Sequence, residues 1–499
     1  RGVTKRKRQI VFLMTDSTRQ DMLGCYGNPD MRTPCLDAIA ENGIRYENAY
    51  SCQPVCGPAR SAIFTGTYPH SNGSIANSVP LGDNVKTLGQ RLRDNGIHTA
   101  YIGKYHLDGG DYFGLGRCPD GWDPEYWYDM RCYLEELDEQ DRARSRNSAA
   151  NRFGVDAEFT FGHRCADRAL RFLGEYGQED FFLTVSFDEP HDPALCPEPY
   201  ASAYLDYEFP KSPNVWDTLE GKPEYQRLWA GENRFADRDA ITLKAPYFLG
   251  CNSYIDTEIS RIVECIHEKA PEALIIYTSD HGDGFQSHCL NGKGAAMYNE
   301  IARVPLLISG PGVPRGVVDA QPVSHINLAP MILEYMGLGL PALLEGNSLL
   351  PAVFDPTKRV NPYVVTEFTR YEIDHDGFGG LQMMRGIFDG RYKLVVHLLE
   401  DTDEFYDQES DPFEMENRIG DDSCYEEKKR LHEALLEWMN RTRDPYRSYR
   451  WERRPWRKEA PAASWKDRGY TRQRENEEYE PRQLDYQTGL PMKEAVRIK

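Results

Sequence analysis

QIVFLMTD, residues 9–16, is the segment from which the fold of this 499-residue chain can be built up. Its five consecutive apolar residues leave no polar face, so the segment predicts a β-strand that is buried on both sides. The run ends at Asp16, a charged residue at the point where the strand leaves the core. Ligands of open α/β sheets bind beyond the carboxyl ends of the strands. The segment therefore predicts a central strand and a candidate site residue together.

Four further segments share this composition, and helical patterns lie between them. The candidate strands are HTAYIG (98–103), DFFLTVSF (180–187), ALIIYTSD (273–280) and VPLLISG (304–310). The candidate helices cover residues 33–43, 87–96, 161–177 and 256–270. Strands that alternate with helices predict an α/β fold, in which a large, mixed, mainly parallel sheet is sandwiched by helices.

The pattern of apolar and polar residues changes after about residue 375. Residues 381–407 read as antiparallel strands joined by an Asp-Gly turn, and a helix is expected from about 425 to 441. Beyond them the chain is rich in Arg, Pro, Trp and Tyr without a clear period, and Trp451 and Trp456 are candidate anchors. We therefore expect a large domain over residues 1–375, a small α+β domain with an antiparallel sheet over 376–442, and an irregular tail packed on the body over 443–499.

Charge and cysteine content restrict the partners and the compartment. Lys and Arg total 59 against 79 Asp and Glu, a net charge of -20 that argues against a nucleic-acid partner. No apolar run is long enough for a membrane span, so no membrane association is expected. The twelve cysteines show no metal-type spacing, which favours reduced, buried thiols. A cytoplasmic location is favoured; a periplasmic or secreted protein with a trimmed signal peptide stays open.

The segment CQPVCGPARSAIFTG, residues 52–66, contains two cysteines, each followed two residues later by a proline. Only Cys56 also has an arginine, Arg60, two residues beyond its proline. By itself this short pattern fits either a nucleophile or a buried thiol beside a turn proline. Cys52 lacks the arginine, because Cys56 occupies that place, and is expected to be structural.

Further motifs follow this one in a fixed order. They are GKYHL (103–107), EPHDP (189–193), TSDHGDG (278–284), Lys293, RVPLLI (303–308), DEFYD (403–407) and DPFEMEN (411–417). With them, the sequence from Gln9 to about Ile419 resembles the formylglycine-dependent sulfatases of the alkaline phosphatase superfamily, in particular bacterial sulfatases of the YidJ type. The resemblance implies an alkaline phosphatase-like fold for the large domain, which would be the catalytic one.

The resemblance also implies that a separate formylglycine-generating maturation enzyme oxidises Cys56 to an aldehyde. The hydrated aldehyde carries two hydroxyl groups on one carbon. One would attack the sulfur of a sulfate ester, and the other, after losing its proton, would expel sulfate and regenerate the aldehyde. The family usually has Ser where Ala59 stands, which leaves open which maturation enzyme acts.

By the same resemblance, Asp16, Asp280 and His281 bind one divalent metal ion, with Ser17 beside them. Ser17 stands where many sulfatases have a second Asp, and His281 where many have Asn. Oxygen ligands favour Ca²⁺, which we expect first, whereas the imidazole of His281 keeps Mg²⁺ and Mn²⁺ as alternatives.

Five residues match the family's catalytic positions. Arg60, Lys104 and Lys293 would hold formylglycine and the sulfate, offsetting the negative charge that builds on them. His106 would take the proton of the hydrate and so release sulfate. His191, with Lys293, would contact the ester oxygen and protonate the leaving alcohol.

The sequence gives less information about the substrate than about the reaction. The aromatic segment 118–129 suits either stacking on a sugar ring or packing in the core. Segment 366–380 lies near the expected domain junction and offers Glu367, Arg370 and His375 as candidate substrate-binding residues. We expect a sulfatase (EC 3.1.6 type) that acts on a small sulfated substrate, most simply a sulfated carbohydrate. The alternatives are a phosphonate monoester or phosphodiester hydrolase and a non-catalytic sulfated-glycan binder. The oligomeric state is not predicted.

Overall fold

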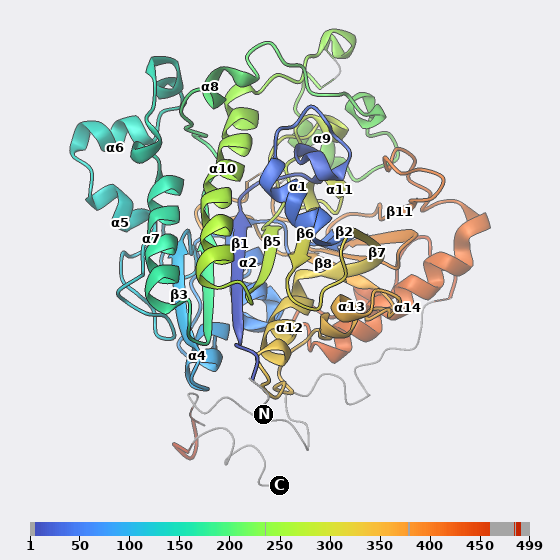
Figure 1. The fold of residues 1–499 in the computed structure, drawn as a ribbon. Coiled ribbons are helices and arrows are strands. Elements are labelled where there is room, and N and C mark those ends of the chain that lie inside the picture. Colours follow the sequence, from blue (N-terminus) through green and yellow to red (C-terminus); the bar gives the residue numbers. More distant parts are fainter. Residues whose placement is uncertain (1–4, 235, 378–379, 460–483, 485, 491–499) are drawn as a thin grey trace.

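The computed structural model describes residues 5–234, 236–377, 380–459, 484 and 486–490. Within them, one large sheet contains β1 (Gln9–Thr15), β2 (Gly43–Tyr50), β3 (His98–Gly103), β4 (Phe181–Ser186), β5 (Leu274–Ser279), β6 (Arg303–Ser309) and β7 (Val317–Ser324). Their order across the sheet is β3-β4-β1-β5-β6-β2-β7 (Figure 1). All neighbours are parallel except β6, which is antiparallel to both β5 and β2. The sheet is therefore mixed and mainly parallel, as predicted.

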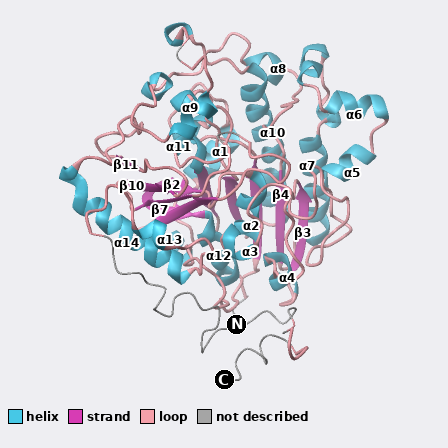
Figure 2. Cartoon of the chain, turned by 180° about the vertical axis from the view of Figure 1, so that it is seen from behind, coloured by secondary structure: helices cyan, strands magenta, loops and turns pink. Residues whose placement is uncertain are grey.

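Helices cover both faces of this sheet. One face carries α1, α7 and α10, and the opposite face carries α2, α4, α12 and α13 (Figures 1 and 2). The α-helices of the described residues are α1 (Pro34–Glu41), α2 (Cys56–Thr65), α3 (Pro69–Asn72), α4 (Leu88–Arg93), α5 (Met130–Glu135), α6 (Glu139–Ser145), α7 (Phe161–Tyr176), α8 (Tyr200–Ala203), α9 (Glu224–Ala230), α10 (Pro246–Lys269), α11 (Asn299–Ala302), α12 (Leu328–Tyr335), α13 (Leu350–Phe354), α14 (Tyr425–Arg441) and α15 (Tyr449–Glu452).

Strand β1 shows why an unbroken apolar run is required at the centre of this sheet. Val11 and Leu13 pack into the core under α1, α7 and α10. Ile10, Phe12 and Met14 pack into the core on the opposite face. Since successive side chains of a strand point to opposite faces, both sets of positions must be apolar.

All five predicted strands of the large sheet are confirmed, but two of its strands were not predicted. β2 (GIRYENAY) and β7 (VVDAQPVS) carry polar residues among the apolar ones, because parts of both strands are only partly buried. α10 begins at Pro246, ten residues before the expected start at 256. The polar run Cys-Asn-Ser at 251–253 weakens the helical pattern there, although all three side chains are buried.

A second sheet, of four strands in the described residues, has the order β11-β10-β9-β8 and is antiparallel throughout. It contains β8 (Val364–Phe368), β9 (Met384–Phe388), β10 (Tyr392–His397) and β11 (Glu404–Asp407), and α14 packs on it (Figure 1). The expected boundary between residues 375 and 376 falls between β8 and β9. The sheet of the small α+β unit therefore begins before that boundary.

Beyond α14, the described part of the tail packs against the apolar cluster that the second sheet forms with α14. Trp451 is fully buried and Trp456 is partly buried against this cluster. Most of the expected tail, residues 460–483, 485 and 491–499, lies outside the described residues. In the described part of the chain, no helix combines the length and the apolar character needed to cross a bilayer.

Candidate active site

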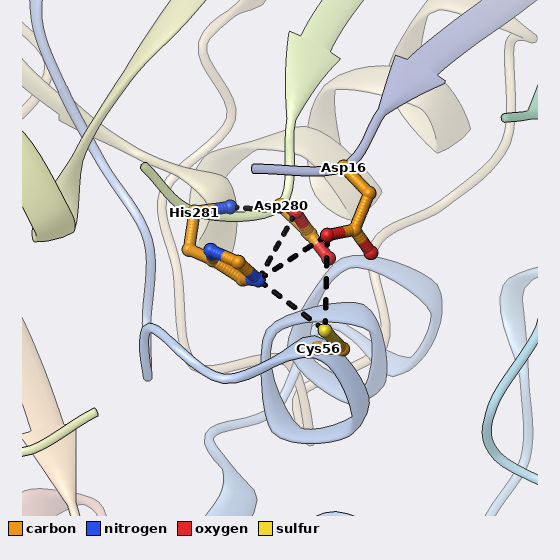
Figure 3. A group of neighbouring side chains, drawn as sticks. All are labelled: Asp16, Cys56, Asp280 and His281. Atoms are coloured by element: carbon orange, nitrogen blue, oxygen red, sulfur yellow. Dashed lines mark hydrogen bonds and ion pairs between the residues drawn. The ribbon is translucent and has the colours of Figure 1, made fainter. Parts of the chain in front are cut away.

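The candidate site lies where β1 and β5 end beside the first turn of α2. The two strands are neighbours in parallel register, with Thr15 opposite Ser279, so the next residues, Asp16 and Asp280, emerge side by side. Cys56 is the first residue of α2 and lies below them (Figure 3). The N-terminus of a helix carries a partial positive charge, which favours an anion at this position.

Four side chains converge at this point, and all are buried. Cys56 Sγ lies 3.3 Å from His281 Nε2 and 3.9 Å from Asp16 Oδ1. His281 Nε2 is 3.6 Å from Asp16 Oδ1 and 3.5 Å from Asp280 Oδ1. The structure therefore brings together the three ionisable metal ligands implied by the sequence and the proposed nucleophile (Figure 3).

This donor set fits a divalent cation. The candidate ligand atoms of Asp16, Cys56, Asp280 and His281 all lie within 4.8 Å of one another. His281 Nδ1 donates a hydrogen bond to the carbonyl oxygen of Gly282 at 2.6 Å, so Nε2 is left to face the carboxylates. A histidine whose second nitrogen is fixed in this way is typical of metal ligands.

Ser17 adds a hydroxyl rather than a carboxylate. Its Oγ donates to Asp16 Oδ1 at 2.8 Å and its backbone N–H to Asp280 Oδ1 at 3.3 Å. Its φ of 67° is in the left-handed region that non-glycine residues seldom adopt. The turn after β1 therefore holds both aspartates in place at some conformational cost.

Arg60 and Lys104 are the cations closest to the aspartates. Arg60, one turn along α2 from Cys56, contacts Asp16 at 3.2 Å and Asp280 at 3.3 Å. Lys104 follows β3, and its Nζ lies 2.7 Å from Asp16 Oδ2 and 3.8 Å from Cys56 Sγ. Both side chains are fully buried, so no solvent screens these interactions.

The charges around the two cysteines of the motif differ sharply. Burial and Asp16 would raise the pKa of the Cys56 thiol, but Lys104, Lys293 and neighbouring cations hold this pKa well below its ordinary value. Burial raises the pKa of Cys52 to about 12. Cys52 Sγ lies 3.5 Å from the hydroxyl oxygen of Ser324 in a packed core. The local environment thus lowers the pKa of Cys56 and raises that of Cys52.

The two aspartates are also unequal. Burial, followed by the charge of Asp16, raises the pKa of Asp280 to about 7. For Asp16, burial acts in the same direction, but Lys104 and neighbouring cations lower the pKa well below its usual value. For His281, burial would lower the pKa, yet Asp280 and Cys56 raise it to about 9. Asp16 is therefore the more acidic of the two carboxyl groups.

His106 lies three residues beyond the end of β3, with a φ of 59°. Its ring is buried, and neither ring nitrogen has a hydrogen-bond partner among the described residues. Burial lowers its pKa, so the ring is neutral and can accept a proton. Burial of an imidazole without a hydrogen-bond partner costs folding free energy, so such a residue is usually retained for a function. This agrees with the predicted place of His106 in the site.

His191 and Lys293 lie on the more open side of the site. Lys293 Nζ is 3.4 Å from His191 Nε2. Lys293 is buried, whereas His191 is partly exposed. The sequence missed two neighbours of this pair, Tyr112 and Asp188. Asp188 comes directly after the candidate strand 180–187 and could have been identified there; Tyr112 is in a loop without a comparable signal.

The candidate substrate residues separate into two groups. Glu367 is fully buried in β8, where its carboxylate accepts hydrogen bonds from His70 and pairs with Arg385, so its prediction as a substrate ligand is wrong. Arg370 and His375 lie on the loop after β8. Arg370 is paired with Asp376 at 2.8 Å, and His375, which is exposed, is 2.6 Å from Glu372.

That loop is attached to the start of α2 through Asn77, which the sequence did not indicate. Asn77 Oδ1 accepts a hydrogen bond from the Gly57 N–H at 2.8 Å, and its backbone N–H donates to the Tyr371 carbonyl oxygen at 2.8 Å. Asn77 therefore ties the backbone of Tyr371 to the start of α2, close to Cys56 in the chain.

The aromatic segment 118–129 packs in the core, which confirms the packing alternative. Trp122 is 5% exposed, and its ring lies edge-on to Phe64 and Tyr101. The ring of Trp127 is also buried against Tyr101. All twelve cysteines are free thiols, and most are buried, as expected.

Comparison with known proteins agrees with this geometry. The "Sulfatase" family model matches residues 8–338, and the model "N-sulphoglucosamine sulphohydrolase, C-terminal" matches residues 290–441. The chain is 41% identical to "Uncharacterized sulfatase YidJ" of Escherichia coli (strain K12), over 99% of each chain. It is 24% identical to "N-acetylglucosamine-6-O-sulfatase" of Bacteroides thetaiotaomicron, over 88% of each.

Among solved structures, the phosphonate monoester hydrolase of Agrobacterium radiobacter is similar with a TM-score of 0.72. The match covers 87% of this chain and 96% of that one, at 22% identity, and shows a shared fold. The family model covers well over half of the chain, and the relative from Escherichia coli matches it from end to end. The chain therefore belongs to the sulfatase family and is a sulfuric ester hydrolase.

Proposed function

We propose that this sulfatase hydrolyses the sulfate ester of a sulfated carbohydrate through a formylglycine formed from Cys56, with the help of one divalent metal ion. One observation carries the proposal. Cys56 Sγ, at the N-terminus of α2, lies within 4 Å of His281 Nε2, Asp16 Oδ1 and Lys104 Nζ. A packed structural thiol such as Cys52 has no such surroundings.

Maturation is a two-electron oxidation at Cβ of Cys56 with loss of the sulfur, carried out by a separate enzyme with an external oxidant such as dioxygen. Asp16, Asp280 and His281 would hold the metal ion, with Ser17 beside them. Ca²⁺ is the first expectation, and Mg²⁺ and Mn²⁺ are the alternatives. When bound, the ion would favour the ionised form of the hydrate.

The remaining roles belong to the chain's own side chains. Arg60, Lys104 and Lys293 surround the position of Cys56 with positive charge and would balance the charge that grows on the sulfate oxygens. His106, neutral and without a partner, would take the proton of the second hydroxyl when sulfate leaves. His191, supported by Lys293, would protonate the leaving alcohol.

A sugar substrate is supported by two findings. The family model that matches residues 290–441 bears the name of a sulfoglucosamine hydrolase, and a relative over most of the chain is named as a sulfatase of N-acetylglucosamine. In the structure, Tyr371 is an aromatic residue on the loop after β8 that Asn77 ties to the start of α2, and sugar-binding sites often contain such residues. Arg370 and His375 follow on the same loop and are candidate contacts to the sugar.

The test is a turnover assay on protein coexpressed with a formylglycine-generating enzyme. The peptide that contains residue 56 should be lighter than its thiol form and should react with a hydrazide. Release of sulfate is then measured from sulfated monosaccharides, an alkyl sulfate and an aryl sulfate, with each candidate metal. We expect the highest kcat/KM among the carbohydrates, and Cys56→Ala is the control for contaminating activity.

The same protein should be assayed on a phosphonate monoester and a phosphodiester. By resemblance, phosphonate hydrolases also have an Asp-His pair, as at Asp280–His281, and also lack the second Asp that Ser17 replaces, so these substrates form the sharpest competitor. A tenfold preference for either, which is about 1.4 kcal/mol of transition-state discrimination, would overturn the proposal. Sulfate release by the Cys56→Ala protein at the wild-type rate would also overturn it.

A further inference from the structure

Tyr112 connects the two halves of the site. It lies on the loop after His106, half-buried, with its hydroxyl between the residues that surround the nucleophile and those on the leaving-group side. Lys104 Nζ lies 3.1 Å from the Tyr112 hydroxyl oxygen, and His191 Nδ1 also lies 3.1 Å from it. The same hydroxyl contacts the Asp188 carboxylate, which Lys104 also approaches, at 3.2 Å.

The directions of these hydrogen bonds follow from the chemistry of the partners. A lysine ammonium group can only donate hydrogen bonds, and a carboxylate can only accept them. The Tyr112 oxygen therefore accepts a hydrogen bond from Lys104, and the Tyr112 hydroxyl donates one to Asp188. Burial and the charge of Asp188 raise the pKa of Tyr112 well above its ordinary value, so the phenol keeps that proton. What is left at the Tyr112 oxygen is a lone pair, and it faces His191 Nδ1.

His191 therefore has one tautomer that satisfies its surroundings. Its Nδ1 faces two acceptors, the Tyr112 oxygen and the Asp192 carbonyl oxygen at 2.9 Å, so Nδ1 carries a hydrogen. Its Nε2 faces Lys293 Nζ, a donor, at 3.4 Å. In the neutral ring Nε2 therefore carries the lone pair, and it is the nitrogen that gains a proton when His191 becomes charged.

The rings are also packed together. The ring centroids of Tyr112 and His191 are 5.3 Å apart with 33° between the planes, and Lys104 Nζ lies 4.2 Å above the Tyr112 ring. Asp188 is 4% exposed and anchors the hydroxyl from β4, since it follows the strand by two residues. Tyr112 is consequently held at both its ring and its hydroxyl.

We propose that Tyr112 is a positioning residue that fixes the orientation and tautomer of His191, so that His191 Nε2 delivers the proton to the leaving alcohol oxygen. This inference rests on the proposed function. When the bond from sulfur to the leaving oxygen breaks, its electron pair stays on that oxygen, which takes the Nε2 proton of protonated His191. Neutral His191 keeps its Nδ1 hydrogen, which it donates to the Tyr112 oxygen. Water restores the Nε2 proton, because the ring is partly exposed.

The dependence of rate on the leaving group tests this role. Matured, metal-loaded wild type and Tyr112→Phe are compared on 4-nitrophenyl, 4-chlorophenyl and phenyl sulfate. A 4-nitrophenolate leaves readily without a proton, whereas a phenolate needs more help from an acid. We expect Tyr112→Phe to lower kcat/KM about tenfold for phenyl sulfate and less than about twofold for 4-nitrophenyl sulfate.

The matched control is Tyr254→Phe in α10. Tyr254 is also a buried tyrosine whose hydroxyl bonds to a carboxylate, that of Glu258 at 2.8 Å, but it lies outside the site. This variant should leave the ratio of the two rates unchanged. An equal loss on all three substrates in Tyr112→Phe, or no loss on any of them, would overturn the positioning role while leaving the proposed function intact. A wild type that releases sulfate neither from these aryl sulfates nor from the sulfated monosaccharides would overturn both.

A double-mutant cycle identifies the residue through which Tyr112 acts. In a His191→Ala background, Tyr112→Phe should cause no further change in the leaving-group dependence, since the group that it positions is absent. An undiminished effect in that background would show that Tyr112 acts through Lys104 instead, and would overturn the assignment to His191.

Discussion

Two buried clusters of charged side chains in this protein are organised in opposite ways. The catalytic cluster consists of Asp16, Cys56, Arg60, Lys104, Asp280 and His281, and the junction cluster consists of His70, Glu367, Arg385 and Asp444. Every member of both clusters is at most 9% exposed. Burial alone therefore does not distinguish a site from a structural element; the arrangement of the charged groups does.

In the junction cluster each charge has a matched partner. Arg385 contacts Asp444 through two nitrogens, at 2.8 and 3.2 Å, in the fork geometry that suits a carboxylate. His70 Nδ1 lies 3.0 Å from both oxygens of Glu367, and its Nε2 lies 3.2 Å from the Thr442 carbonyl oxygen. These contacts connect α3, β8, β9 and the end of α14, and thus fix the second sheet to the large domain.

In the catalytic cluster, by contrast, several potential ligand atoms converge. Two carboxylates and the thiol of Cys56 face one point, and His281 Nε2 is directed at the same point. Arg60 and Lys104 pair with the carboxylates from outside this point, and a divalent cation within it would add a further partner. The difference indicates that ligand atoms directed at one point mark the site, whereas charges paired without such convergence mark the structural junction.

The largest expected effect separates the two cysteines at the N-terminal side of α2. Cys56→Ala should lower kcat/KM by at least about 10⁴-fold, because no nucleophile remains. Its melting temperature should stay within a few degrees of wild type, since the thiol contacts polar side chains rather than an apolar core. Sulfate release and thermal unfolding of the matured protein measure the two quantities. Cys52→Ala is the matched control and should keep its kcat; equal losses in both variants would contradict the assignment.

The next effect concerns the ligands of the metal. Asp280→Asn should reduce turnover by about 10³-fold or more, because the charge that would hold the cation is lost. Metal-depleted wild type should gain melting temperature when Ca²⁺, Mg²⁺ or Mn²⁺ is added, and Asp280→Asn should gain little. Full turnover of wild type after exhaustive chelation would contradict a metal role for this group.

The sequence predicted those parts of the fold where burial on both faces forces a continuous apolar run. β1, β4 and β5 are such strands, and Asp16 and Asp280 follow β1 and β5 directly. The pattern marked strand ends as candidate positions, whereas the metal-binding role of Asp16, Asp280 and His281 came from the family resemblance. β2 and β7 were missed because strands with partial exposure tolerate polar residues. The apolar-run signal cannot detect them.

The rest of the site depends on contacts between distant segments. Glu367 was misassigned because a carboxylate near a domain junction is expected to be exposed. Only the fold shows that its side chain is buried against His70 and Arg385. Tyr112 and Asn77 belong to loops, whose position is set by tertiary packing rather than by local pattern. No spacing in the sequence places the Tyr112 hydroxyl between Lys104 and His191.

A smaller effect, on stability alone, is expected in the junction cluster. Arg385→Met should lower the free energy of unfolding by about 3–5 kcal/mol, because it removes the guanidinium from the buried Asp444 and leaves Glu367 with His70 alone. The kcat of the folded protein should change less than about twofold. Denaturant unfolding and turnover of the same preparation measure both.

Arg391→Met is the matched control in the same sheet. Arg391 pairs with Asp407 at 3.1 Å but is about half exposed, so its loss should lower the free energy of unfolding much less than the loss of Arg385. If Arg385→Met were to remove activity without loss of stability, the junction cluster would belong to the site, and the distinction between the two clusters would fail.

The smallest effect is the pH dependence of the junction cluster. Both nitrogens of His70 face acceptors, which favours the imidazolium form. Burial would lower its pKa, but Glu367 and Asp444 raise it from 6.5 to about 9. Since the folded-state pKa exceeds the unfolded one, the charged ring contributes stability that is complete below pH 6.5 and is lost as the pH rises through about 9. The free energy of unfolding at pH 9.5 should therefore be lower by about 2–3 kcal/mol than at pH 6.5 because of His70.

His70→Gln, compared with wild type at the two pH values, isolates this contribution from other titrating groups. The variant should lose less stability than wild type over this range, and an identical loss in both proteins would show that Glu367 and His70 form no ion pair.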